Sequence, residues 1–132
     1  IGAESSDFSL AGDGESTLTG NVVITQGTLE VKADRAVVVR RGGNLISFTF
    51  TGKPASLQQV RVTGEPMTAK ASRILYRMDS EVVTLTGDVI IEDPSGTLRG
   101  QTVNYDMRSG RLSGGNDGGR VRMRLLPKRS DD

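Results

Sequence analysis

The 132-residue chain has no cysteine, no histidine and no tryptophan. Without cysteine it can form neither a disulfide scaffold nor a thiolate metal site. Without histidine it lacks the side chain that most often serves as a general base or a metal ligand. Its aromatic residues are three Phe and two Tyr, too few to favour a surface that binds bases or sugars by stacking. These absences disfavour catalysis and metal binding, and no cofactor is expected.

The chain also lacks an excess of charge of either sign and any long apolar run. It carries 17 Lys and Arg against 16 Asp and Glu, a net charge of +1, whereas nucleic-acid binding normally requires a clear basic excess. No apolar run approaches the roughly 18 residues of a membrane span, and no signal peptide is visible. The chain begins at Ile1 rather than Met, so we expect a mature or trimmed form. Its length predicts one domain over 1–127, followed by a flexible polar tail over 128–132.

One stretch of the sequence occurs twice. LTGNVVITQ begins at Leu18 and LTGDVIIED begins at Leu85, and the likeness continues without a gap across 18–38 and 85–105. Within each copy, apolar residues or Gly alternate with mostly polar residues, as in Leu18–Ile24. A period of two is typical of strands in a sheet that has one buried and one solvated face. Gly residues recur between short Val, Ile, Leu and Thr runs, so the chain is predicted to be all-β and antiparallel.

The alternation slips by one residue within each repeat. Val31 and Ala33 share one face, whereas the next pair, Ala36 and Val38, is out of phase with them. The same slip occurs in the second copy and in the middle of the chain. A strand keeps one face toward the core through such a slip only if an extra residue is accommodated, so we predict a β-bulge or a sheet corner at each slip. A small residue lies beside each slip: Ala33, Ala71 and Gly100.

Four segments carry a resemblance to a known family. They read, in order, LTGNVVITQGTLEVKADRAVVV, GKPASLQQV, AKASRILYRMDSEVVTLTGDVII and LRGQTVNYDMRSGRL. Together they cover nearly all of the chain, although Gln101 stands where the motif more often has Asp. In this order and spacing, the sequence resembles the OstA-like family of periplasmic lipopolysaccharide-transport proteins.

The resemblance implies an open, twisted antiparallel β-jelly roll of about sixteen short strands, whose two sheets form a V with apolar inner faces. It implies a non-enzymatic carrier in the periplasm that shields the acyl chains of lipopolysaccharide and passes it from the inner to the outer membrane. The implied partners are lipopolysaccharide, further copies of the chain arranged head to tail, a membrane-anchored LptC-like relative, and the N-terminal domain of an LptD-like outer-membrane translocon.

The inward-facing residues are assigned to the lipid groove by this resemblance. From the residues alone, an ordinary closed core stays open as the alternative, because alternation is how any sheet buries one face. Each buried methylene of an acyl chain contributes about 0.8 kcal/mol, so an apolar groove can hold a lipid without a specific contact. The inward residues are Leu18, Val22, Ile24, Val31, Val38, Phe48, Phe50, Ile74, Tyr76, Leu85, Val89, Ile91, Leu98, Val103, Tyr105, Val121 and Met123.

The terminal strands are the expected docking edges. An edge strand leaves N–H and C=O groups unpaired, and a partner can satisfy them by adding a strand. The cations of the C-terminal strand either discourage unwanted pairing or bind lipid phosphates or an acidic neighbour. The edge residues are Ile1, Phe8, Leu10, Arg120, Val121, Arg122, Met123, Arg124 and Leu125.

Two other functions stay open. The first is a structural β-roll module, or an N-terminal OstA domain of the translocon, that recruits partners by edge-strand addition. The second is a polysaccharide-active enzyme, which would need a pair of carboxylates. The acidic residues mostly lie beside Gly or at strand ends, where roles in turns and bulges are expected. They are Asp34, Asp79, Asp88, Glu92 and Asp93. The segment GGNDGG from Gly114 is expected to be a hairpin loop rather than a calcium-binding repeat.

Overall fold

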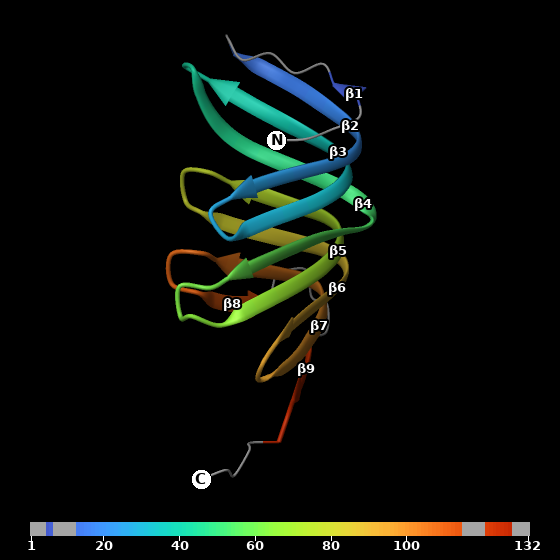
Figure 1. Cartoon of the computed structure of the whole chain (residues 1–132), viewed down its shortest axis with the longest axis vertical. Helices are drawn as coiled ribbons and strands as arrows, with labels where there is room; N and C mark the ends of the chain where they lie inside the picture. The colour runs from blue at the N-terminus through green and yellow to red at the C-terminus, as the bar shows by residue number, and fades with distance from the viewer. Residues whose placement is uncertain (1–4, 7–12, 115–120, 128–132) are drawn as a thin grey trace.

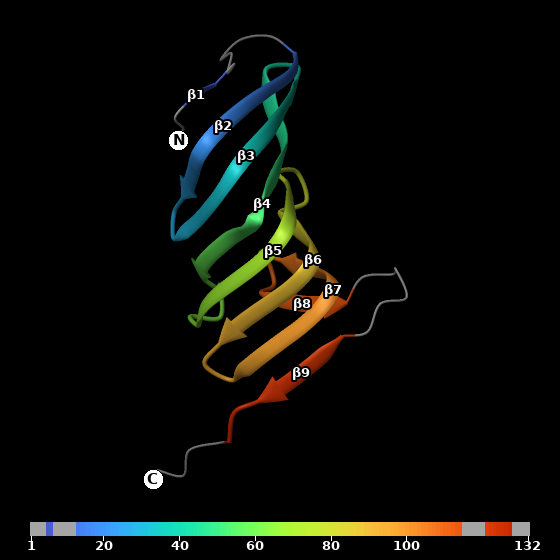
Figure 2. The ribbon, with the colours of Figure 1, turned by 90° about the vertical axis from the view of Figure 1, so that its right-hand side faces the viewer.

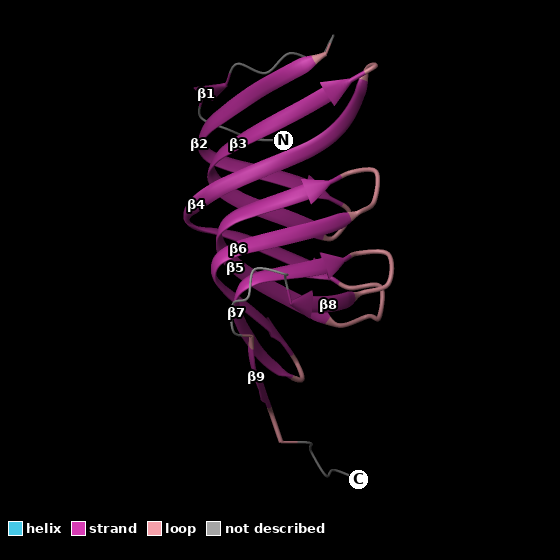
Figure 3. Ribbon diagram, turned by 180° about the vertical axis from the view of Figure 1, so that it is seen from behind, coloured by secondary structure: helices cyan, strands magenta, loops and turns pink. Residues whose placement is uncertain are grey.

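The computed structural model describes residues 5–6, 13–114 and 121–127 (Figure 1). These residues form strands and turns and contain no helix that is long and apolar enough to cross a membrane (Figure 3). The strands are β1 (Ser5–Ser6), β2 (Gly14–Gln26), β3 (Leu29–Arg41), β4 (Asn44–Val60), β5 (Pro66–Arg77), β6 (Val82–Asp93), β7 (Gly96–Asp106), β8 (Arg111–Gly114) and β9 (Arg122–Leu125).

The strands form one antiparallel sheet in chain order from β1 to β8, and β9 pairs with the other half of β7. Consecutive strands stack along the long axis of the molecule, as Figures 1 and 2 show. Within the described residues the sheet does not close on itself, because its order runs from β1 at one end to β8 and β9 at the other. The prediction of an open, all-β, antiparallel fold is confirmed.

Each long strand bends at an interruption of its register. The pairing shifts between Thr19 and Val22 in β2, and comparable shifts interrupt β3, β4, β5 and β6. The bends align along the sheet and divide it into two facing arms. Each bent strand contributes one of its halves to each arm. The turns between strands project on the side away from the bends (Figure 1). The interruptions in β3, in β5 and in the β6–β7 pairing coincide with the slips beside Ala33, Ala71 and Gly100, so the bends predicted there are confirmed. The bends of β2 and β4 were not predicted. Together, these interruptions fold one sheet into a V.

We define the two arms by their residues. The tyrosine arm contains 14–19, 35–41, 44–51, 73–77, 82–86, 102–106 and β8. The glutamine arm contains 22–26, 29–32, 55–60, 66–70, 89–93, 96–100 and β9.

The repeated T-G-N/D-V motif produces two of these bends. Gly20 and Asn21 have φ angles of 78° and 43°, and Gly87 and Asp88 have φ angles of 91° and 48°. Two consecutive residues in the left-handed region turn the chain sharply. Gly tolerates that region without cost, and Asn and Asp tolerate it better than most other residues. The repetition in the sequence is therefore a repetition of the bend.

The number of strands differs from the expected sixteen or so short ones. Each long strand is continuous through its bulge, so the two arms of β2, for example, count as one strand of 13 residues rather than two. The bend at β4 is the longest of these interruptions, spanning Gly52, Lys53 and Pro54 between Thr51 and Ala55. The peptide bond between Lys53 and Pro54 is cis.

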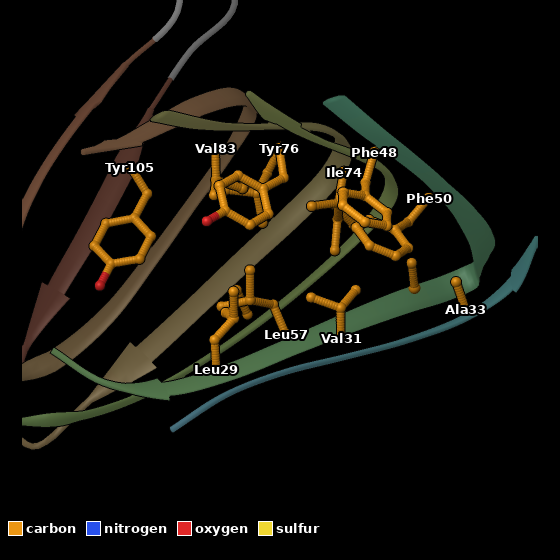
Figure 4. Close-up of a cluster of buried hydrophobic side chains, with 14 of the residues drawn as sticks. Leu29, Val31, Ala33, Phe48, Phe50, Leu57, Ile74, Tyr76, Val83 and Tyr105 are labelled. Carbon is orange, nitrogen blue, oxygen red and sulfur yellow. The ribbon is translucent and has the colours of Figure 1, made fainter. Parts of the chain in front are cut away.

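The core lies between the two arms. Figure 4 shows Phe48, Ile74 and Tyr76 on the tyrosine arm pointing toward Val31 and Leu57 on the glutamine arm. Small side chains lie where the arms converge at the bends, because little space remains between the two backbones there. These side chains are Ala33, Ala36, Ala55, Ala69 and Ala71, and none is more than 8% exposed.

Candidate functional site

The candidate site is the slot between the arms, lined by rows of side chains that run across the strands. In the tyrosine arm, Phe50 pairs with Ile74, and Ile74 pairs with Leu85. In the glutamine arm, Val31 pairs with Leu57, which pairs in turn with Ala69. Paired residues in adjacent strands point to the same face. Each row is therefore a continuous apolar stripe along the long axis of the molecule.

Aromatic rings concentrate on one side of the slot. The rings of Phe48 and Phe50 stack with centroids 5.8 Å apart and planes 4° apart, and Phe48 also stacks with Tyr76 at 6.4 Å. All three belong to the tyrosine arm and face the interior. They supply a large apolar area with few rotatable bonds.

The predicted inward residues are buried, except for the two nearest the C-terminus. None of the residues from Leu18 to Tyr105 in this set is more than 8% exposed. The buried members are Leu18, Val22, Ile24, Val31, Val38, Phe48, Phe50, Ile74, Tyr76, Leu85, Val89, Ile91, Leu98, Val103 and Tyr105. Their side chains lie between the arms and are covered as in a packed core.

Besides a small cavity near β9, the slot contains a cavity beside the stacked aromatic rings. Its volume is about 140 Å³, and both arms line it, including Ile24, Leu29, Phe48, Tyr76 and Gln26. A cavity of this size resembles an engineered apolar cavity that accommodates a benzene molecule. It is therefore too small for several acyl chains unless the arms move apart.

Polar side chains bridge the arms at the mouth of the slot. The hydroxyl of Tyr76 donates a hydrogen bond to Oε1 of Gln26 at 2.7 Å, and the hydroxyl of Tyr105 donates to Oε1 of Gln59 at 2.5 Å. Burial raises the pKa of both tyrosines above the ordinary value. The nearby Glu81 adds to the rise for Tyr76. Both hydroxyls therefore remain protonated donors at neutral pH.

An ion pair lies beside the second bridge. Nη1 of Arg61 is 3.0 Å from Oδ2 of Asp93, and the two side chains are 11% and 13% exposed. Burial acts to raise the pKa of Asp93, but hydrogen bonds from Ser95 and Gly96, together with Arg61, hold that pKa below its ordinary value. Asp93 thus remains charged and closes the β6–β7 turn, as expected for a turn residue.

The other acidic residues also occupy turns and bulges. Asp88 lies in the β6 bulge, and Asp34 lies where the pairing of β3 shifts. The Asp79 carboxylate accepts a hydrogen bond from the backbone N–H of Ser80. Glu92 instead pairs within the glutamine arm, with Thr68 and Thr97. Among the described residues, no three acidic side chains form a cluster that could hold a metal ion.

The C-terminal strand differs from the sequence-based expectation. Val121 and Met123 were expected to be inward and covered, but they are 40% and 62% exposed, and Leu125 is 68% exposed. Met123 pairs with Leu98 and so shares the inner face of the glutamine arm. It remains exposed because β9 has four residues and, among the described strands, pairs only with β7. This apolar end is open in the described structure.

The other predicted edge residues lie partly inside and partly outside the described structure. Arg122 and Arg124 belong to β9 and are exposed, as expected for cations on an outer face. Ile1, Phe8, Leu10 and Arg120 lie outside the described residues, as do residues 115–119 of the GGNDGG segment and the tail over 128–132.

Sequence reasoning missed the two glutamines at the mouth. Alternation through Val22 and Ile24 places Gln26 on the inner face, and alternation through Ala55 and Leu57 does the same for Gln59. The signal was therefore present in the sequence. Their partners were not predictable, since each bridge joins residues 50 or 46 positions apart.

Comparison with protein families gives one matching family model. Residues 2–111 match the model described as LptA/(LptD N-terminal domain) LPS transport protein. The chain is 33% identical over 119 residues to the lipopolysaccharide export system protein LptA of Escherichia coli K12, covering 88% of this chain and 64% of that protein. It is 31% identical over 115 residues to the protein of the same name in Haemophilus influenzae, covering 84% and 67%. The chain thus spans less than two thirds of the Escherichia coli relative.

A solved structure shares the fold. LptH of Pseudomonas aeruginosa, described as the LptA-homologous periplasmic component of a lipopolysaccharide transport device, superposes with a TM-score of 0.84. The match covers 96% of this chain and 93% of that chain at 21% sequence identity. A likeness at this level of identity establishes a common architecture.

Proposed function

Because this chain belongs to the LptA/(LptD N-terminal domain) LPS transport protein family, we propose that it is a non-catalytic carrier of lipopolysaccharide in the periplasm. The acyl chains occupy the slot between the arms, and the sugars remain outside. The observation that carries the proposal is the pair of apolar stripes, which line the slot from β2 to β7.

The physical properties of the slot suit a carrier rather than a tight receptor. Its inner surface consists of similar aliphatic and aromatic side chains, so each methylene contributes about 0.8 kcal/mol wherever it lies. A lipid can therefore slide along the stripes without meeting one deep energy minimum. Since the cavity of the empty protein is only about 140 Å³, binding requires the arms to separate about their bends.

Transfer between molecules would use the ends of the sheet. The exposed side chains of Met123 and Leu125 continue the inner face of the glutamine arm to its C-terminal edge. A second copy that adds a strand there would extend the apolar interior head to tail. The proposed partners are further copies of the chain, an anchored LptC-like relative and the N-terminal domain of an LptD-like translocon.

Site-specific photocrosslinking tests the carrier function. A photoreactive residue at Val22 or Ile74 points into the slot, whereas one at Val23 or Leu75 points to the outer face of the same strand. We expect lipopolysaccharide to be captured at 22 and 74 and much less at 23 and 75. The paired positions match in side-chain type and lie next to each other, so they control for local exposure to lipid.

Equal labelling of the two faces would contradict the carrier function. The packed interior also supports a second candidate, a β-module that only recruits partners through its edges. That candidate requires oligomers to form while no inner position captures lipid.

A further inference from the structure

Two tyrosine–glutamine hydrogen bonds join the arms across the mouth of the slot. Tyr76 and Tyr105 come from the tyrosine arm, and Gln26 and Gln59 come from the glutamine arm. From this geometry, and resting on the proposed carrier function, we propose that both pairs are latches. They hold the arms together while the slot is empty, and they break when acyl chains enter.

The positions of the tyrosines support this role. Tyr76 pairs with Phe48 on one side and Val83 on the other, so it lies within an otherwise apolar row of the inner face. Tyr105 continues the row beyond Val83. A phenylalanine would fill the same space. The hydroxyl is therefore the distinguishing group, and each hydroxyl reaches a side chain of the opposite arm.

The two hydrogen bonds are strong enough to favour closed arms but too weak to prevent the arms from opening. The two tyrosines are 5% and 0% exposed, and a buried hydroxyl without a partner is costly. Each hydroxyl therefore favours the closed arrangement. A neutral hydrogen bond nevertheless contributes only a modest net stability in water, because water replaces the partner once the arms open. Two such bonds bias the arms toward closure without locking them.

The two latches lie in different surroundings. Gln26 and Tyr76 both line the 140 Å³ cavity, and Gln26 is exposed to solvent. At the other latch the turns of the two arms are in close contact, since a Cβ at Gly110 would lie 3.2 Å from Cγ1 of Val62. The Tyr76–Gln26 latch therefore controls access to the roomier part of the slot, and the Tyr105–Gln59 latch holds the tighter end.

The first test measures the separation of the arms without lipid. The chain has no cysteine, so spin labels can be placed selectively at Ser47→Cys on the tyrosine arm and Thr68→Cys on the glutamine arm. Removing a latch hydroxyl with Tyr76→Phe keeps the ring in the core. We expect a longer and broader distance distribution in this variant than in the parent, and a further increase when Tyr105→Phe is added.

The second test measures how fast the unlabelled proteins capture lipopolysaccharide. Each lost latch should increase the capture rate by about fivefold, the effect of one ordinary hydrogen bond. Gln59→Leu removes the acceptor of Tyr105 and should act like Tyr105→Phe. Gln58→Leu is the matched control, because the neighbouring Gln58 donates to Glu30 within the glutamine arm and should leave both readouts unchanged.

The two readouts separate failure of the latch from failure of the carrier function. Unchanged distances and capture rates in the double tyrosine variant would overturn the latch, and so would slower capture, which would mean that the hydroxyls hold the lipid. If the parent captures no lipopolysaccharide at all, the carrier function fails. The lipid-free distances then still decide whether the latches close the slot.

Discussion

Gly87 shows how single residues determine the bend of a strand. Its φ angle of 91° lies in the left-handed region, and a Cβ there would lie 2.6 Å from Oγ of Ser72. Ser72 belongs to the bulge of the neighbouring strand β5, so the bulges of β5 and β6 lie against each other. Backbone conformation and packing thus both require glycine at this position.

Replacing Gly87 by Ala should destabilise the protein by about 2–5 kcal/mol, the combined effect of left-handed strain and overpacking. Gly43→Ala is the matched control, because Gly43 has a φ angle of 80° but open space around it. It should cost about 1–2 kcal/mol from strain alone. Urea unfolding of both variants measures the difference, and equal losses would show that contact with Ser72 does not matter.

Among the strands, β9 differs from the others. It has four residues, all of them exposed, and its described partner is β7 on one side. The strands β3 to β6, by contrast, are paired along both edges for most of their length. An exposed edge with apolar side chains on one face favours association with another strand.

Deleting residues 121–126 should therefore abolish long oligomers and leave a folded monomer. The six long strands keep their pairing with one another in this variant, and β7 loses only its contact with β9, so the far-ultraviolet circular dichroism should remain that of a β-protein. Light scattering over a range of concentrations measures the assembly.

The double variant Arg122→Ala with Arg124→Ala separates the backbone edge from its charge. Because strand addition uses main-chain groups, this variant should still form oligomers.

One result would contradict the role of β9. If the protein that lacks residues 121–126 still forms chains of many subunits, the assembly edge is another strand.

In the whole molecule, one sheet provides both walls of the slot. The bends of β2 to β6 form a common line, so separation of the arms requires a concerted change at the bulges rather than the breaking of strand pairs.

The bridging residues Tyr76 and Tyr105 carry hydroxyl groups that can lose a proton. Their pKa values are raised by burial, so the folded state retains the phenolic protons at a higher pH than the unfolded state does.

This difference predicts a loss of stability in alkaline solution. A raised pKa in the folded state contributes stability that is complete below the ordinary tyrosine value of about 10 and declines as the pH rises through the folded-state pKa. The free energy of unfolding should therefore fall above about pH 10. It should fall less steeply in the double variant Tyr76→Phe with Tyr105→Phe. Denaturant unfolding at several pH values, followed together with tyrosinate absorbance, measures both effects, and identical slopes would exclude a contribution from the tyrosines.

The local rules of strands account for what could be read from the amino acids alone. Alternation identified many of the buried positions from Leu18 to Tyr105, because side chains of a strand alternate between faces whatever the partner strand is. The predicted set nevertheless left out Leu29, Leu57 and Met67, which are buried as well. The phase slips identified the bends in β3, β5 and β7 for the same reason. The Gly-Asn and Gly-Asp pairs explain two further bends, in β2 and β6, through backbone conformation, which depends on those residues and their immediate neighbours.

Distances between segments far apart in the chain were decided only by folding. Alternation cannot tell whether two apolar faces meet or remain apart, because the angle at the bends and the packing of Phe48 against the opposite arm determine the gap. Nor can it pair Tyr76 with Gln26, which lies 50 residues away. Met123 follows the pattern of a buried residue, yet it is exposed because no described segment covers it. A side chain is buried only when another surface covers it. A periodic pattern specifies which face of a strand is apolar, but it does not show whether a second surface covers that face.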